Sequence, residues 1–69
     1  MNKLLVTNSA ERDVMEKVLR VANIFARINK IKGTVFLDNL GNIVTSDMTE
    51  EQNAILRTYA LGALTALSF

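Results

Sequence analysis

Apolar side chains in the first half of the chain recur at spacings of three and four residues, which is typical of a helix with one apolar face. Two neighbouring stripes form this face: Val14, Val18, Val21, Phe25 and Ile28, and beside them Met15, Leu19, Ala22 and Ala26. The start is predicted at Asn8, a residue type that caps helices, with Glu11 at the third helical position. The helix is expected to end near residues 29–31, with Gly33 as the left-handed residue beyond it.

A β-hairpin is predicted after this helix. Residues 34–38 and 43–46 are rich in β-branched and other apolar side chains, and residues 38–42, Asp-Asn-Leu-Gly-Asn, have the composition of a turn. Two strands alone make a marginal sheet. We therefore expect the short apolar segment at residues 3–7, or strands of another subunit, to complete it.

The last helix, which begins near Glu50, is apolar on both sides. Thr49 and Gln52 have the spacing of a capping box, and no charged residue follows Arg57. On a helical wheel, the side expected to face the protein's own sheet or other helix comprises Ile55, Leu56, Tyr59, Ala60, Ala63, Ala66 and Leu67. Leu61 and Leu64 lie in the middle of the opposite side. Either they are simply exposed, as single surface leucines often are, or another protein covers them.

The order of these elements predicts the fold class. The chain is expected to be a single small α+β domain over residues 1–69, with the order (β)αββα and two helices packed on a β-hairpin.

Composition narrows how such a small domain is stabilised. A chain of 69 residues buries only about 60% of the surface that its unfolded form exposes, and small folds usually add disulfides, a metal or further subunits. The sequence contains no Cys and no His, which excludes disulfides and an ordinary zinc site. We therefore predict a homo-oligomer, most simply a dimer, with Tyr59 on the intramolecular side of the helix. The predicted interface residues are Ala60, Leu61, Leu64 and Phe69.

Candidate chemistry is sparse. Without His or Cys, the commonest general bases and strong nucleophiles are missing, so we expect no enzyme and no catalytic site. The carboxylates Asp38, Asp47, Glu50 and Glu51 lack the spacing of a calcium loop and are better explained as caps of a turn and a helix. Isolated glycines do not form a phosphate-binding loop. We therefore expect neither a metal nor a cofactor.

A basic stripe is the main charged feature, although the formal net charge of the chain is only +1. It consists of Arg20, Arg27, Lys30 and Lys32. Positively charged residues interact favourably with the helix dipole at the C-terminal end of a helix. The simplest explanation of the stripe is therefore an ordinary helix face exposed to solvent. An acidic protein or a nucleic acid are the alternative partners. Nucleic acid is not favoured, because no aromatic residue lies among these four to stack on bases.

The location expected from the sequence is the cytoplasm. The uncharged run near the C-terminal end is shorter than the roughly 20 apolar residues that span a membrane. The apolar run at residues 4–6 is interrupted by Thr7-Asn8-Ser9, unlike the core of a signal peptide.

The hairpin and its flanking helices resemble the first half of the Roadblock/LC7 family. Gly33-Thr34-Val35-Phe36-Leu37-Asp38 is similar to the family's first strand, Asn39-Leu40-Gly41-Asn42 to its turn, and Ile43-Val44-Thr45-Ser46 to its second strand. A long Ala/Leu-rich helix then follows, as in that family. The resemblance implies a non-catalytic, dimeric scaffold with the second helix at the dimer interface. The family's further strands and last helix are absent, which puts partners of the GTPase type in doubt.

These observations predict a non-catalytic protein–protein interaction module: an adaptor, scaffold or inhibitor that self-associates through its apolar C-terminal helix. The alternative is a small regulator of viral or mobile-element origin. Such a regulator would bind a host enzyme or nucleic acid through the basic end of the first helix.

Overall fold

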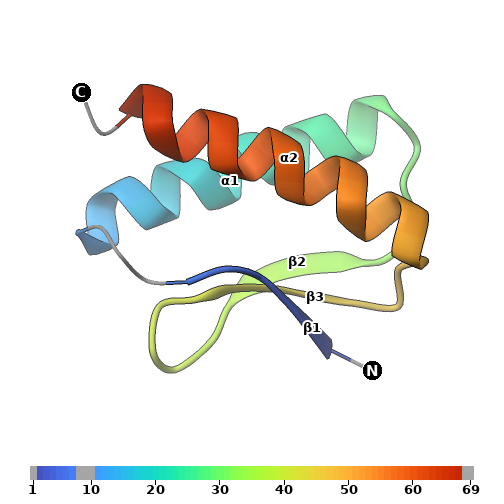
Figure 1. The fold of residues 1–69 in the computed structure, drawn as a ribbon, viewed down its shortest axis with the longest axis horizontal. Coiled ribbons are helices and arrows are strands. Elements are labelled where there is room, and N and C mark those ends of the chain that lie inside the picture. Colours follow the sequence, from blue (N-terminus) through green and yellow to red (C-terminus); the bar gives the residue numbers. More distant parts are fainter. Residues whose placement is uncertain (1, 8–10, 68–69) are drawn as a thin grey trace.

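The computed structural model describes residues 2–7 and 11–67, which form three strands and two helices (Figure 1). The elements in chain order are β1 (Asn2–Val6), α1 (Arg12–Ile28), β2 (Thr34–Leu37), β3 (Ile43–Ser46) and α2 (Glu50–Leu67). This is the α+β fold that the sequence predicts, with two helices packed on a hairpin.

The N-terminal segment completes the sheet within the subunit. The strand order is β1-β3-β2 and both pairings are antiparallel. Thr45 at the centre of β3 pairs with Lys3 on one side and with Val35 on the other. The register shifts between Leu4 and Val6, a β-bulge that leaves both Leu5 and Val6 buried. Of the two alternatives left by the sequence, the strand within the subunit is the one observed.

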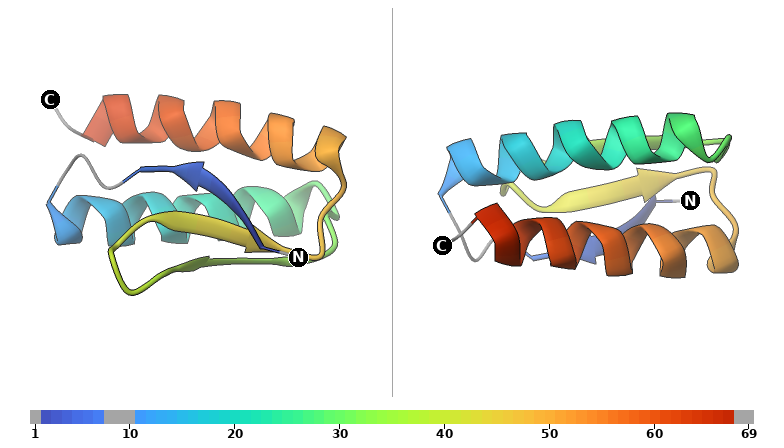
Figure 2. Two further views of the ribbon diagram at one scale, coloured as in Figure 1. Left: turned by 60° about the horizontal axis from the view of Figure 1, so that its bottom comes forward. Right: turned by 90° about the horizontal axis from the view of Figure 1, so that it is seen from above.

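Both helices cover the same face of the sheet, and they run antiparallel to each other (Figures 1 and 2). α2 contacts β1, and α1 contacts β2. Because successive strand residues point to opposite faces, Ile43 and Thr45 lie under the helices while Val44 points away from them. On the open face, Val44 is flanked by its cross-strand partners Leu4 and Phe36.

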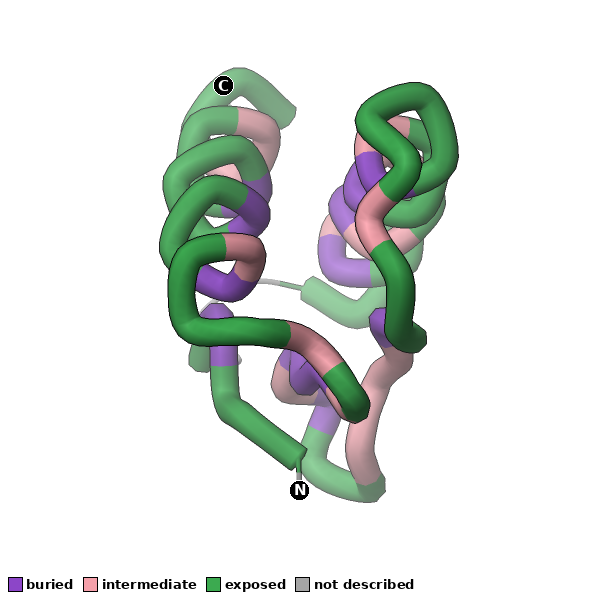
Figure 3. Tube along the Cα trace, turned by 90° about the vertical axis from the view of Figure 1, so that its right-hand side faces the viewer, coloured by how far each residue is buried: buried purple, intermediate pink, exposed green. Residues whose placement is uncertain are grey.

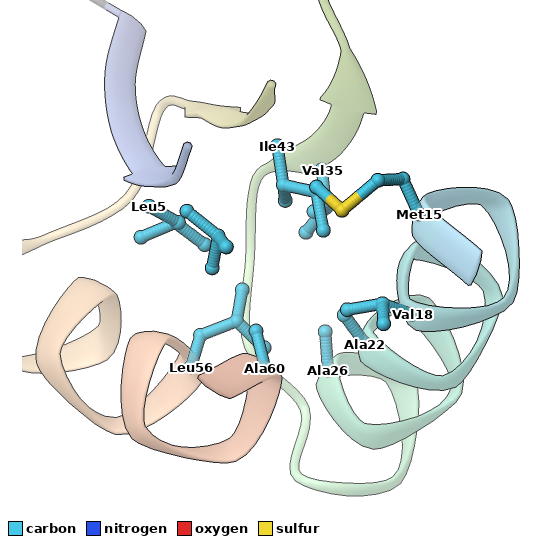
Figure 4. Packing of buried hydrophobic residues seen from close by; sticks show 10 residues of the cluster. Leu5, Met15, Val18, Ala22, Ala26, Val35, Ile43, Leu56 and Ala60 are labelled. Atoms are coloured by element: carbon cyan, nitrogen blue, oxygen red, sulfur yellow. The ribbon is translucent and has the colours of Figure 1, made fainter. Parts of the chain in front are cut away.

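The core fills the space between the helices and the sheet. Met15, Val18, Ile43 and Leu56 are fully buried there, and the side chain of Met15 extends from α1 towards the strands (Figure 4). The unbranched, flexible side chain of methionine suits such a gap between layers. In Figure 3 the buried sides of the two helices face each other and the sheet, and their exposed sides face outwards. The domain therefore has one core, on the helical side of the sheet.

The boundaries of α1 differ from those predicted. The helix starts at Arg12 with Glu11 as its N-cap, and Glu11 makes no side-chain capping hydrogen bond. The predicted cap, Asn8, lies outside the described residues. At the other end, Lys30 is the left-handed residue, with φ of 57°. The N–H of Lys30 donates to the carbonyl of Arg27 at 3.1 Å, and that of Ile31 to the carbonyl of Ala26 at 2.9 Å. This is a Schellman motif, and its left-handed residue lies three positions before Gly33.

Gly33 is required for a different reason. Its φ is +121°, and a Cβ on this residue would lie 2.7 Å from the carbonyl oxygen of Ser46 and 2.7 Å from Cγ of Met48. The start of β2 thus packs directly against the connection between β3 and α2. Only glycine fits there without displacing the backbone.

The predicted turn and capping box are both present. The Asp38 carboxylate accepts hydrogen bonds from the backbone N–H groups of Leu40, at 2.8 Å, and Asn42, at 2.9 Å. At the start of α2, the N–H of Gln52 donates to Oγ1 of Thr49, and the N–H of Thr49 donates to Oε1 of Gln52. These local bonds fix the hairpin and the entry of α2, because each satisfies backbone donors that would otherwise lack a partner.

The orientation of α2 differs from the wheel prediction. Asn53, which is not among the residues predicted on the inner side, is buried together with Leu56 and Ala60, whereas Ile55, predicted to face the core, is 54% exposed. The hydroxyl of Thr45 on β3 donates to Oδ1 of Asn53, which satisfies both side chains in the core. Since α2 is apolar around much of its circumference, hydrophobicity alone does not define its inner side.

Candidate functional site

The outward-facing surface of the two helices is a candidate functional site. Tyr59, Gly62 and Ala66 of α2 line an open groove with Val21 of α1. Ile24 and Ile28 continue the Val21 side of α1 at helical spacing, and Ile55 lies one turn before Tyr59. We call this surface the outer helical face. It comprises Val21, Ile24, Ile28, Ile55, Tyr59, Gly62, Ala66 and Leu67.

The outer helical face is apolar and accessible. Ile28 is 72% exposed, Ile55 54% and Ile24 50%. Thr58 and Thr65 are the polar residues of α2 beyond Arg57 in the described part of the helix, and neither carries a charge. Isolated exposed apolar side chains are ordinary, but a contiguous group across two helices is typical of an interaction surface.

A stacked aromatic pair forms the floor of this face. The rings of Phe25 on α1 and Tyr59 on α2 have centroids 4.0 Å apart and planes inclined by 18°. Tyr59 therefore lines the contact between the helices, as predicted, while 36% of its surface stays exposed. The pair therefore joins the two halves of the outer helical face.

A second candidate surface runs along the outer edge of β1. Three adjoining hollows follow the strand from Asn2 to Thr7 and are closed on the other side by α2, from Glu50 to Leu64. We call this surface the edge groove. Its lining includes Asn2, Lys3, Leu4, Thr7, Glu50, Ala54, Arg57, Leu61 and Leu64. The groove therefore combines one strand edge, one helix side and several charged residues.

The two ends of the edge groove differ in chemistry. At one end, Nζ of Lys3 forms an ion pair with the Glu50 carboxylate. At the other, Leu61 and Leu64 provide an apolar wall above β1. Arg57 lies between the two ends and lines both of the hollows that meet there.

The residues predicted for an oligomer interface are divided between three places. Ala60 has 0% exposure and belongs to the subunit's own core, so it has no surface to offer a partner. Leu61, 40% exposed, and the half-buried Leu64 line the edge groove. Phe69 lies outside the described residues.

The basic stripe is exposed throughout. Arg20 and Arg27 lie on α1, and Lys30 and Lys32 lie in the connection to β2. Arg27 is in the last turn of α1, where a positive charge interacts favourably with the helix dipole. This dipole effect accounts for the position of Arg27 without a ligand.

Of the candidate carboxylates, Asp38 and Glu50 have partners within the subunit. Hydrogen bonds to the Asp38 carboxylate, first from the backbone N–H of Asn42 and then from its side-chain amide and the N–H of Leu40, lower the pKa of Asp38 below its ordinary 3.8. In residues 2–7 and 11–67, no three carboxylates come together as a group able to hold a metal ion. No helix in the same part of the chain has the length and apolar character needed to cross a membrane.

The sequence did not indicate either surface completely. Ile28 was assigned to the inner stripe of α1, although its 72% exposure places it outside. The two stripes predicted on the first helix do not include Ile24, which lies on the opposite side of the helix from the buried Met15, Val18 and Ala22. The edge groove depends on β1 lying beside α2, a tertiary arrangement that no local pattern indicates.

Comparison with protein-family models, with curated proteins and with solved structures found no match to this chain. The resemblance to the Roadblock/LC7 family therefore stays a prediction.

Proposed function

We propose that this protein is a non-catalytic interaction module, an adaptor, scaffold or inhibitor of the cytoplasm, that self-associates through the outer helical face. The observation that carries the proposal is the exposure of Ile24, Ile28 and Ile55, which continue the lining of the open groove between the helices at helical spacing. Fully burying one such side chain contributes about 1.5–3 kcal/mol. Several of them buried together offset the entropy lost when two molecules associate.

A second copy is the occupant that best suits this surface. A two-fold interface places the same patch on both subunits, so it favours a surface without net charge. The described part of α2 carries no charge beyond Arg57, and its small residues Gly62 and Ala66 let another helix approach closely. With no disulfide available to the chain, self-association also supplies the stabilisation that a small domain usually needs.

The edge groove is less suited to self-association. Leu61 and Leu64 adjoin Arg57, and a symmetric contact there brings the Arg57 side chains of both copies into the same region. Like charges in an interface oppose association. We therefore assign self-association to the outer helical face and not to the leucines that the sequence favoured.

Cysteine footprinting tests this assignment, because the chain has no natural cysteine. Ile55→Cys places a thiol on the outer helical face, and Leu40→Cys places one in the hairpin turn as a control. The alkylation rate of Ile55→Cys should fall as protein concentration rises, while that of Leu40→Cys stays constant. Equal, concentration-independent rates at both positions would refute the proposal.

A further inference from the structure

The two edges of the sheet are not equivalent. At the β2 edge, the side-chain amide of Asn23 on α1 lies 3.5 Å from the carbonyl oxygen of Val35. At the opposite edge, β1 has a neighbouring strand, β3, on one side only within the described residues. The edge groove lies along this side of β1. Alternate residues of an edge strand direct their N–H and C=O groups outwards, where another strand can pair with them.

The groove also offers side-chain selectivity. Arg57 lies near its middle and forms no ion pair with any carboxylate among residues 2–7 and 11–67. Leu61 lies one helical turn further along, about 6 Å in rise. Alternate side chains on one face of a strand are spaced by nearly the same distance, about 6.7 Å. A strand lying in the groove can therefore place one side chain at Arg57 and the next helix-facing side chain at Leu61.

We propose that the edge groove binds an extended segment of a partner protein as a fourth strand beside β1. The segment carries a carboxylate side chain that pairs with Arg57. Two residues away it carries an aliphatic side chain that packs on Leu61 and Leu64. Main-chain pairing supplies affinity and the two side chains supply selectivity, as in other proteins that recognise peptides by strand addition.

Charge distinguishes this occupant from a second copy of the chain. If β1 of a second copy paired with β1, the charged side chain that the second copy directs towards the helices would be Lys3. Lys3 would approach Arg57, which carries the same positive charge. Lys3 is also already paired with Glu50 in its own subunit. The bulge at Leu5 interrupts the regular backbone pattern of β1, so the segment recognised is short.

The probes for the test are acetylated and amidated peptides, Thr-Thr-Glu-Thr-Leu-Thr-Thr and its reverse order, Thr-Thr-Leu-Thr-Glu-Thr-Thr. We expect at least one of them to shift the amide NMR signals of β1, on the wild type and on Ile55→Glu alike. Glutamine in place of the peptide's glutamate, or Arg57→Glu in the protein, should weaken binding about tenfold or more. Arg20→Glu, which changes an exposed arginine away from the groove, should leave binding unchanged.

Main-chain pairing has its own control. N-methylation of the peptide residues whose amides face β1 should abolish binding, whereas N-methylation of the alternate set should not.

The proposal is overturned if neither peptide shifts the β1 signals at about 1 mM, or if Arg57→Glu binds the peptide as well as the wild type does. It is also overturned if Leu61→Glu, and not Ile55→Glu, dissociates the oligomer, because a second copy then occupies the groove. Self-association and peptide binding can thus fail independently.

Discussion

Phe25 on α1 and Tyr59 on α2 stack with their ring centroids 4.0 Å apart, and this contact joins the two helices beneath the outer helical face. Most other contacts between the layers are made by aliphatic side chains and alanines. The aromatic pair is therefore the most specific contact between α1 and α2.

The Phe25–Tyr59 pair should show a measurable coupling energy. In a double-mutant cycle with Phe25→Leu and Tyr59→Leu, we expect a coupling of about 0.5–1.5 kcal/mol, because stacked rings contribute beyond the area they bury. Urea unfolding of the four proteins, at one protein concentration, gives the free energies of unfolding. A cycle that pairs Phe25→Leu with Leu40→Ala, which lies in the distant hairpin turn, is the control and should be additive. Additivity in the Phe25–Tyr59 cycle as well would contradict the contact.

The buried hydrogen bond from Thr45 to Asn53 should be important for stability. Thr45→Val keeps the shape of the side chain but leaves Oδ1 of Asn53 without its donor in the core. We expect a loss of about 1–3 kcal/mol in the free energy of unfolding. The matched control is Thr34→Val, on an exposed strand position, which should change stability by no more than about 0.5 kcal/mol. Equal effects from the two substitutions would show that the buried bond is not stabilising.

The two glycines Gly33 and Gly62 should respond to alanine in opposite directions. Gly33→Ala places a Cβ against the Ser46 carbonyl at positive φ and should destabilise the fold by about 1–3 kcal/mol. Within the subunit, a Cβ on Gly62 meets nothing within 4 Å, so Gly62→Ala made in the Ile55→Glu background, where no second copy packs on α2, should stabilise the helix by up to about 1 kcal/mol. Thermal unfolding of both variants checks the contrast. A neutral Gly33→Ala would mean that β2 does not pack against the β3–α2 connection as described.

Acid should weaken the hairpin turn through Asp38. Its pKa is lower in the folded chain than the ordinary 3.8, so the ionised carboxylate stabilises the fold above about pH 4. This contribution is lost as pH falls through the folded pKa. Asp38→Asn cannot titrate, so the stability difference between wild type and variant should shrink from about pH 6 to about pH 3. A difference that is constant with pH, followed by urea unfolding, would rule out this role for the carboxylate.

The order of elements could be predicted because it depends on local signals. The turn at Asp38 and the capping box of Thr49 and Gln52 each involve residues within four positions of one another, and both occur as expected. The start and end of α1 could not be predicted as well. Its end depends on Lys30 adopting a left-handed conformation that glycine more often provides.

The candidate site was harder to predict for a physical reason. A helix that is apolar on several sides has no single hydrophobic direction, so packing against β1 and α1 decides which residues are buried. That packing buries Ala60 and Asn53 and leaves Ile55 exposed. The sequence of α2 alone therefore could not show that Ala60 is buried within the subunit, or that Leu61 and Leu64 line the edge groove.

The most direct test of self-association is solution mass from light scattering on a sizing column, over a dilution series of the wild type, Ile55→Glu and Leu61→Glu. We expect a wild-type mass of at least two chains that decreases on dilution, and the mass of one chain for Ile55→Glu, because burying an unpaired charge costs several kcal/mol. Leu61→Glu should keep the wild-type mass. A wild type that has the mass of one chain at every concentration, or an unchanged oligomer in Ile55→Glu, would show that the outer helical face does not join two copies of this protein.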